Sequence, residues 1–234
     1  FVMSIGNRVY LKRPMPDAEI VKALGQIPAA NIADTMGRSC ALNPRIRLFS
    51  NPDAPIVAGP ALTVKARGGD NLMIHQALDM AQEGDILIVS NEEDTNRSLM
   101  GEIMFTYAQY KKLGALILDG PIRDIDAVRQ MKLPIYATGS TPGGPYKEGP
   151  GEVNVPVACG GISVYPGDIV VADADGVIVI PRNDAAAVLA AAQRFHEQDA
   201  AKVEAAAAGK ANRAWVMKKL VAKETEIIDG CYGE

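Results

Sequence analysis

The chain has 234 residues, of which 48% are hydrophobic and 22% charged, and a formal net charge of −4 at pH 7. This size and composition are typical of a globular protein with a sizeable core. The acidic balance offers no basic field for nucleic acid, and no apolar run approaches the roughly 18 residues of a membrane span. We therefore expect neither a nucleic-acid partner nor a membrane partner. An acidic substrate would need positive charge that is concentrated locally.

Cysteine and histidine usage limits the possible chemistry. The three widely spaced cysteines, Cys40, Cys159 and Cys231, form no CxxC pair and no plausible disulfide framework, so we expect a reducing, cytoplasmic compartment. The two histidines have no HxH or HExxH spacing, which argues against a zinc centre. We interpret His75, on an apolar helix, as structural and His196 as solvated.

Hydrophobic spacing predicts alternating helices and strands in the first part of the chain. Helices are predicted over 17–27, 28–36, 71–82, 98–112 and 123–131, and strands over 56–67, 86–90, 115–120 and 133–138. Asp70 is a plausible N-cap, and Gly59-Pro60 indicates a bend or an edge in the first strand. The segments ILIV and ALIL are apolar on both faces, as a covered parallel sheet requires. An α/β layer follows.

The pattern changes after residue 140. The Gly/Pro-rich stretch 141–151 predicts a loop, and 153–164 and 168–180 predict β structure with a tight turn at Asp173–Gly176. An Ala-rich helical segment then runs to about Glu226, with Trp215 and Leu220 as possible anchors. We expect an α/β core domain over 1–181 and a C-terminal helical arm over 182–234 at a subunit interface.

The segment Asp119–Asp124 is the first candidate site, because ligand sites in α/β folds lie at the carboxyl ends of strands. Arg123 could grip a carboxylate through two parallel hydrogen bonds, and Asp124 could hold a hard cation such as Mg²⁺. The same pair also fits a structural role, as a carboxylate at a helix N-terminus beside a neighbouring Arg. The pattern alone leaves both interpretations open.

Residues near the preceding helix and in the Gly/Pro loop extend this candidate site. Glu102 lies near the helix start, where an acidic residue also favours the helix dipole. Gly101 allows close backbone approach, and the amides of Ile103 and Met104 could bind a substrate carboxylate. Lys147 could form a Schiff base, bind a carboxylate or phosphate, or be merely exposed. Its polar loop argues against the Schiff base, which needs a desolvated lysine.

The spacing of Glu102, twenty residues and then Arg123-Asp124 resembles the acidic-x20-Arg-Asp signature of the 4-hydroxy-4-methyl-2-oxoglutarate / 4-carboxy-4-hydroxy-2-oxoadipate aldolases. Their close relative is the regulator of ribonuclease E activity A. Further segments that resemble this family are GDNLMIHQALDMAQEGDILIV, GALILDGPIRD, TPGGPYKEGPGEVNVPVACGG and VYPGDIVVADADGVIVIP. The resemblance runs from about Asn31 to Pro181. It implies a swivelling β/β/α sandwich, assembled as a homotrimer or homohexamer with sites between subunits.

The resemblance also implies roles for single residues. Asp124 would bind Mg²⁺ or Mn²⁺ directly, and Glu102 would act through a water on the metal. Arg123 would bind the pyruvyl carboxylate or its enolate oxygen. Backbone amides after Gly101 would complete the pyruvate cradle, with Lys147 close to the site.

A carboxylate from the neighbouring subunit's arm would complete the outer shell of the metal. Asp199 matches that position best, with Glu197 and Glu204 as rivals. The family usually has Glu at the arm position and Asp at the position of Glu102. Each replacement changes the reach of the carboxylate by one methylene, which leaves the natural substrate open.

The chain is therefore predicted to be a divalent-metal-dependent (class II) pyruvate aldolase, in which Glu102, Arg123 and Asp124 are catalytic. It would cleave 4-hydroxy-4-methyl-2-oxoglutarate or 4-carboxy-4-hydroxy-2-oxoadipate to pyruvate plus pyruvate or oxaloacetate, with oxaloacetate decarboxylation as a side activity. The alternative is a non-catalytic regulator that binds ribonuclease E and shares the motif. The residues that follow Pro181 favour the enzyme, because the regulators typically end near the last strand.

Overall fold

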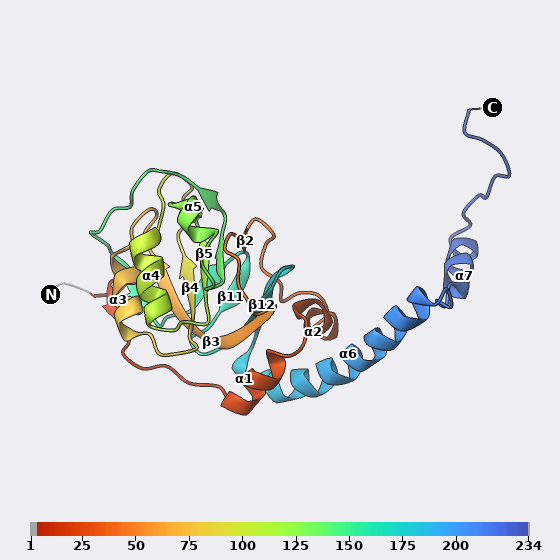
Figure 1. Ribbon diagram of the computed structural model, residues 1–234, viewed down its shortest axis with the longest axis horizontal. Helices are drawn as coiled ribbons and strands as arrows, with labels where there is room; N and C mark the ends of the chain where they lie inside the picture. The colour runs from red at the N-terminus through yellow and green to blue at the C-terminus, as the bar shows by residue number, and fades with distance from the viewer. Residues whose placement is uncertain (1–3, 234) are drawn as a thin grey trace. The chain divides into compact units, whose positions relative to one another are not determined.

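The computed structural model describes residues 4–233, and their contacts divide the chain into two units, one up to His196 and one from Glu197 onward. Figure 1 shows a large sheet with helices against it in the first unit. The helices are α1 (Ala18–Leu24), α2 (Ala29–Thr35), α3 (Leu72–Met80), α4 (Glu102–Tyr110), α5 (Ile125–Val128), α6 (Ala185–Ala207) and α7 (Ala214–Ala222). The strands are β1 (Arg8–Val9), β2 (Arg47–Leu48), β3 (Ile56–Ala66), β4 (Ile86–Ser90), β5 (Ala115–Asp119), β6 (Pro121–Ile122), β7 (Ile135–Ala137), β8 (Gly139–Ser140), β9 (Gly151–Val153), β10 (Val157–Cys159), β11 (Ile162–Val164), β12 (Ile169–Asp173) and β13 (Gly176–Ile180).

The main sheet runs in the order β1-β9-β3-β4-β5-β7-β2. Its centre, β3-β4-β5-β7, is parallel, which confirms the predicted α/β layer. Strand β3 changes partner along its length. Its residues 56–60 pair antiparallel with β12, and 61–65 pair parallel with β4. Gly59-Pro60 therefore marks this change of partner and not a sheet edge. A Cβ at Gly59 would lie 2.3 Å from the Gly84 carbonyl oxygen, so glycine is required for this close approach.

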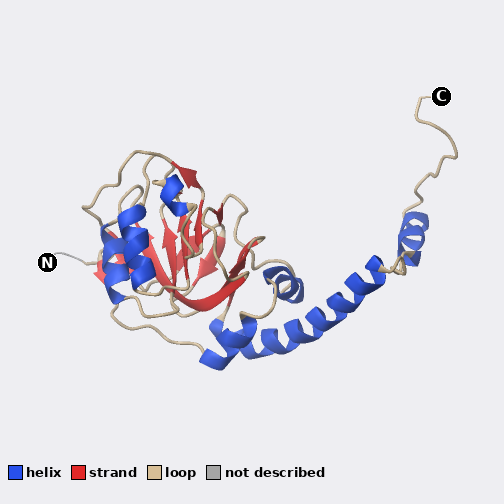
Figure 2. Cartoon of the chain, in the orientation of Figure 1, coloured by secondary structure: helices blue, strands red, loops and turns tan. Residues whose placement is uncertain are grey.

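Side chains alternate between two cores across the central strands, as period-2 strands require. Leu87 and Val89 of β4 pack with α3 and α4, whereas Ile86 and Ile88 pack with β10, β12 and β13. Figure 2 shows helices on one side of the central strands. The first unit is thus a β/β/α sandwich, as expected. A third apolar cluster joins α1, α2 and the start of α6 to β12 and β13.

Two helices begin later in the structure than the sequence predicted. The segment 98–101 is not helical, because the N–H groups of Ser98 and Leu99 donate to the carbonyl oxygens of Gly143 (2.8 Å) and Pro121 (2.9 Å). Helix α4 begins only at Glu102. The helix predicted over 123–131 is the short α5, preceded by β6, which pairs with β8. These long-range hydrogen bonds override the local helical spacing.

The predicted C-terminal helical segment consists of two helices. Helix α6 ends at Ala207, and Gly209 has a φ of +70°, a left-handed conformation that commonly ends helices. Within α7, Trp215 is 61% exposed and Leu220 half-buried. The prediction of a solvated His196 was wrong, since it is half-buried with Nδ1 2.8 Å from Asn31 Oδ1. In the described part of the chain, no helix is long and apolar enough to cross a membrane.

Candidate functional site

The candidate site is built by segments that follow the parallel strands. A cavity of about 290 Å³ is lined by residues that follow β3, β4 and β5 and by the loop that precedes β9. Its lining is Asn71, His75, Leu99, Met100, Gly101, Ile103, Met104, Arg123, Asp124, Gly144, Pro145 and Lys147. Segments far apart in sequence meet here because parallel strands end at the same edge of the sheet.

A larger cavity of about 610 Å³ lies elsewhere in the first unit, lined by the 10–14 segment and by residues around β11–β13. Its basic side chains are Lys12, Arg13 and Arg182, and its one acidic side chain, Asp168, accepts backbone N–H groups of Tyr165 and Arg182. It contains none of the residues that the sequence predicts for the site. We therefore place the candidate site in the smaller cavity, where an Arg, a carboxylate and a Lys converge.

Asp124 lies in an uncommon backbone conformation, with φ 60° and ψ 44°. Such values are rare for residues other than glycine and persist only when the surroundings hold them. The Glu102 N–H donates to Asp124 Oδ2 (2.8 Å), which places the carboxylate at the start of α4. Arg123 Nε lies 3.8 Å from the same oxygen. Both side chains remain reachable, with 44% and 41% of Arg123 and Asp124 exposed.

Gly101 makes this arrangement possible. A Cβ at this position would lie 2.4 Å from Asp124 Oδ2 and 2.9 Å from Arg123 Nε. On the other side, a Cβ at Gly144 would lie 3.4 Å from Arg123 Nη1. Glycine at position 101 therefore leaves room for the Asp124 carboxylate and the Arg123 guanidinium group, and Gly144 borders the same guanidinium group.

The first turn of α4 presents backbone donors beside this pair. The Met104 N–H donates to the Gly101 carbonyl oxygen (3.0 Å), and the Glu102 N–H is taken by Asp124. Among the described residues, the Ile103 N–H has no hydrogen-bond acceptor, so it is the donor left for an anion. The Glu102 side chain is exposed and does not line the cavity.

Lys147 and His75 face the same cavity from the loop and from α3. Lys147 is exposed, which does not provide the desolvation that a Schiff-base lysine needs. His75 is half-buried, and its pKa is lowered first by burial and then by the Lys147 ammonium group, while Asp79 opposes the shift. His75, interpreted from the sequence as structural, thus also lines the candidate site.

Asn71 was missed by the sequence analysis, which treated it only as the first residue of a helix. It is 2% exposed, and its Nδ2 donates to the Leu99 carbonyl oxygen (2.9 Å). Its Oδ1 is buried and finds no hydrogen-bond partner within residues 4–233, although buried polar atoms are usually satisfied. An amide at the start of an apolar helix was the only available signal.

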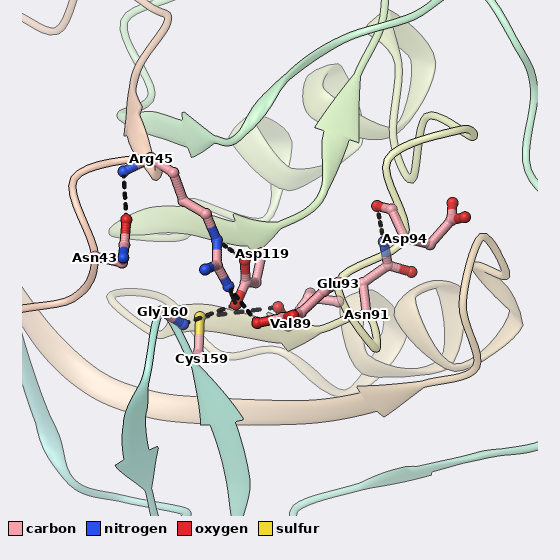
Figure 3. A network of polar contacts seen from close by, with 9 residues as sticks. All are labelled: Asn43, Arg45, Val89, Asn91, Glu93, Asp94, Asp119, Cys159 and Gly160. Carbon is pink, nitrogen blue, oxygen red and sulfur yellow. Dashed lines mark hydrogen bonds and ion pairs between the residues drawn. The ribbon is translucent and has the colours of Figure 1, made fainter.

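A network of polar contacts surrounds Asp119 at the end of β5, as Figure 3 shows. Arg45 donates from Nε and Nη2 to the two carboxylate oxygens of Asp119 (3.1 and 2.9 Å), and the Gly160 N–H donates to Asp119 Oδ2 (2.7 Å). The neighbouring Cys159 is fully buried, and burial raises the pKa of its thiol. The network therefore anchors the residue from which the Asp119–Asp124 segment departs, and it presents no reactive thiol.

The remaining predicted residues lie outside this cavity. Asp199, Glu197 and Glu204 are on the part of α6 that belongs to the second unit, so their contribution to a neighbouring subunit's site stays a prediction. Among residues 4–233, no group of three or more His, Cys, Asp or Glu side chains could hold a metal ion. Asp124 is the one carboxylate residue among the described residues that line the cavity.

The sequence also matches the model of a known family, RraA-like, described as Aldolase/RraA, over residues 29–179. The chain belongs to the Aldolase/RraA family. A Halalkalibacterium halodurans relative named "Putative 4-hydroxy-4-methyl-2-oxoglutarate aldolase" is 35% identical over 193 residues, which are 82% of this chain and 91% of the relative. The candidate site lies within the matched region.

Two solved structures share the fold of this chain. An uncharacterized protein from Pseudomonas syringae pv. tomato has a TM-score of 0.73 at 23% identity, covering 84% of this chain and 96% of its own. Streptomyces coelicolor RraAS2, described as an unusual member of the RNase ES inhibitor RraA protein family, has a TM-score of 0.71 at 27% identity, covering 80% and 97%. The family thus includes both proteins named as aldolases and a member of an inhibitor family.

Proposed function

We propose that this protein is a divalent-metal-dependent aldolase that releases pyruvate from 4-hydroxy-2-oxo diacids such as 4-hydroxy-4-methyl-2-oxoglutarate or 4-carboxy-4-hydroxy-2-oxoadipate. The observation that carries the proposal is the convergence of Arg123, Asp124, Lys147 and the Ile103 N–H in one cavity. Three of these groups favour a bound anion, and the fourth is a carboxylate that can hold a cation. A small dicarboxylate that carries a metal-binding 2-oxo group matches that combination of charges.

The carboxylate chemistry of the cavity fits a hard cation. Mg²⁺ commonly takes only one or two protein carboxylates and keeps several waters. Asp124 Oδ2 is oriented by the Glu102 N–H, and no hydrogen bond among the described residues uses Oδ1. Asp124 would therefore hold Mg²⁺ or Mn²⁺, which when bound supplies a Lewis acid that polarises the 2-oxo group.

The protein's own residues account for the rest of the cleavage. Arg123 would pair with the carboxylate next to the 2-oxo group, and the Ile103 N–H would add a backbone donor. Glu102 would accept the proton of the C4 hydroxyl group through a water. The C3–C4 bond then breaks as a carbonyl forms at C4, and its electron pair passes to the enolate of pyruvate. Arg123 stabilises that enolate charge, and protonation at C3 gives pyruvate.

The same enolate would form by loss of carbon dioxide from oxaloacetate, so a decarboxylase side activity belongs to the proposal. The regulator alternative needs a surface that binds ribonuclease E and assigns no role to a cavity with convergent charges. The aldolase uses each of those charges. Lys147, Arg123 and the names of the curated relatives favour it.

Pyruvate release is the direct test of this function. The protein is expected to release pyruvate from at least one diacid in a panel of 4-hydroxy-2-oxo diacids and oxaloacetate when Mg²⁺ is present. A chelator should abolish release, and added Mg²⁺ or Mn²⁺ should restore it, because Asp124 holds the cation that polarises the substrate. Activity that survives complete metal removal would contradict the mechanism. No release from any panel member would leave the regulator as the better account.

Lys147 is expected not to form a covalent intermediate, because its exposed position lacks the desolvation that activates a Schiff-base lysine. The protein would be incubated with pyruvate and borohydride, and its intact mass compared with that of an untreated sample. An unchanged mass is the expected result. A reduced pyruvate adduct that disappears in Lys147→Met would instead establish a Schiff-base route.

A further inference from the structure

The backbone around Lys147 is fixed by the short segment that leads into α3. On one side, the Tyr146 N–H donates to the Gly69 carbonyl oxygen (2.8 Å) and the Asn71 N–H donates to the Tyr146 carbonyl oxygen (3.0 Å). These two bonds place the peptide before Lys147 beside the start of α3. The loop, although rich in Gly and Pro, is thus held where Lys147 enters the cavity.

The buried carboxylate of Asp70 fixes the backbone that follows Lys147. Its Oδ2 accepts the N–H groups of Glu148 (2.7 Å) and Gly149 (2.8 Å), while its Oδ1 accepts the Leu72 N–H (2.9 Å). Asp70 is 2% exposed, and no salt bridge to it exists among the described residues. A buried carboxylate is costly unless hydrogen bonds satisfy it, and here three backbone donors do so. The sequence suggested only an N-cap.

We propose that Asp70 is a positioning residue, which joins the start of α3 to the Lys147 loop and so holds the Lys147 ammonium group at the cavity for a substrate carboxylate. The carboxylate accepts N–H groups from the two residues that directly follow Lys147 and from the first turn of the helix that carries His75. Loss of those bonds would free the lysine without removing it. The identity of the substrate rests on the proposed function, whereas the position of Lys147 does not.

A second contact supports the same loop from outside. Arg97 donates from Nη2 to the Tyr146 hydroxyl group (2.8 Å) and from Nη1 to the Gly144 carbonyl oxygen (3.1 Å). Its guanidinium carbon lies 4.0 Å from the Tyr146 ring centroid, a cation–π contact. Arg97 therefore offers a milder way than Asp70 to loosen Lys147.

His75 provides a reporter that does not depend on activity. The Lys147 ammonium group contributes to the lowering of the His75 pKa, after burial, and the chain's other histidine, His196, contacts Asn31 instead. Two histidine signals can be assigned by single substitutions and titrated by NMR. Lys147→Met is expected to raise the His75 pKa, which calibrates the effect of losing the charge.

The decisive variant is Asp70→Asn, whose amide cannot replace the carboxylate toward all three N–H donors. Its His75 pKa is expected to rise toward the Lys147→Met value as the lysine moves away. Loss of the Asp70 charge would by itself lower the His75 pKa, so the two effects oppose each other. With an active substrate, KM should rise about tenfold while kcat changes less.

The matched control is Asp168→Asn. Asp168 is also buried and accepts two backbone N–H groups, from Tyr165 (2.9 Å) and Arg182 (3.0 Å), but it lines the larger cavity. The Asp168→Asn variant should have reduced thermal stability, whereas its His75 pKa and its KM should equal those of the wild-type protein.

The double variant Asp70→Asn/Lys147→Met shows whether the two effects cancel. If Lys147→Met raises the His75 pKa as much in folded Asp70→Asn as in the wild-type protein, the lysine has not moved and the proposal is overturned. If Asp70→Asn does not fold, Arg97→Lys decides in its place, because it keeps the positive charge but loses the paired N–H donors to Tyr146 and Gly144; a smaller rise is expected, and no rise would contradict the proposal. A wild-type protein without aldolase activity would disprove the proposed function, yet the NMR titration would still test the position of Lys147.

Discussion

Replacing Arg123 with Lys is expected to lower kcat/KM for pyruvate release by about 10²- to 10³-fold. The guanidinium group borders Gly101 and Gly144 and lies next to Asp124, where two parallel N–H donors can meet a carboxylate. A lysine keeps the positive charge but loses that planar pair of donors, so the substitution is not conservative at such a site. Steady-state kinetics with the best panel substrate would measure the effect.

The matched control is Arg129→Lys, at the residue that directly follows α5. Arg129 is 67% exposed and lies 3.5 Å from Asp126, outside the residues that line the candidate cavity. It should retain wild-type kcat/KM and thermal stability. Equal, small effects of the two substitutions would show that Arg123 does not bind the reacting part of the substrate.

Gly101→Ala is expected to reduce kcat/KM by roughly 10²-fold, although it adds only one methyl group. That group would lie 2.4 Å from Asp124 Oδ2, so the carboxylate must leave the Glu102 N–H, and the arginine must move with it. The backbone at Gly101 has φ −139°, which alanine adopts readily, so the effect would come from contact and not from backbone strain. Kinetics and a Mg²⁺ titration would measure the loss.

Gly139→Ala is the control for this glycine. Gly139 lies in β8, which pairs with β6 beside the Arg123 segment, and a Cβ there would meet nothing within 4 Å. This variant should keep both activity and Mg²⁺ affinity. If Gly101→Ala also kept them, the close approach of Asp124 to the start of α4 would be irrelevant to function.

The sequence predicted the parallel core of the sheet because its signal is local. Residues 86–89 and 115–118 are apolar on both faces, which only a sheet covered on both sides satisfies. The alternation of these strands with helices α3 and α4 then predicted an α/β layer. The residues that converge at its edge, Arg123, Asp124 and Lys147, were also named in advance.

The local form of the site could not be predicted in the same way. Arg123-Asp124 was expected to open a helix, but Asp124 has a left-handed conformation and its carboxylate accepts the Glu102 N–H, twenty-two residues away. Asp70 was interpreted only as an N-cap, because local sequence does not reveal its hydrogen bonds with Glu148 and Gly149, which lie 78 and 79 residues away. Helical spacing and cap preferences describe neighbours in sequence and carry no information on such contacts.

The measurement that tests the central claim most directly is a calorimetric titration of pyruvate into the protein with and without Mg²⁺. The account predicts that Mg²⁺ tightens pyruvate binding by about fivefold or more, and that pyruvate tightens Mg²⁺ binding by the same factor, because both ligands occupy one cavity. Asp124→Asn should remove this coupling. Pyruvate affinity that is independent of Mg²⁺ in the wild-type protein would contradict a shared metal and pyruvate site at Arg123 and Asp124.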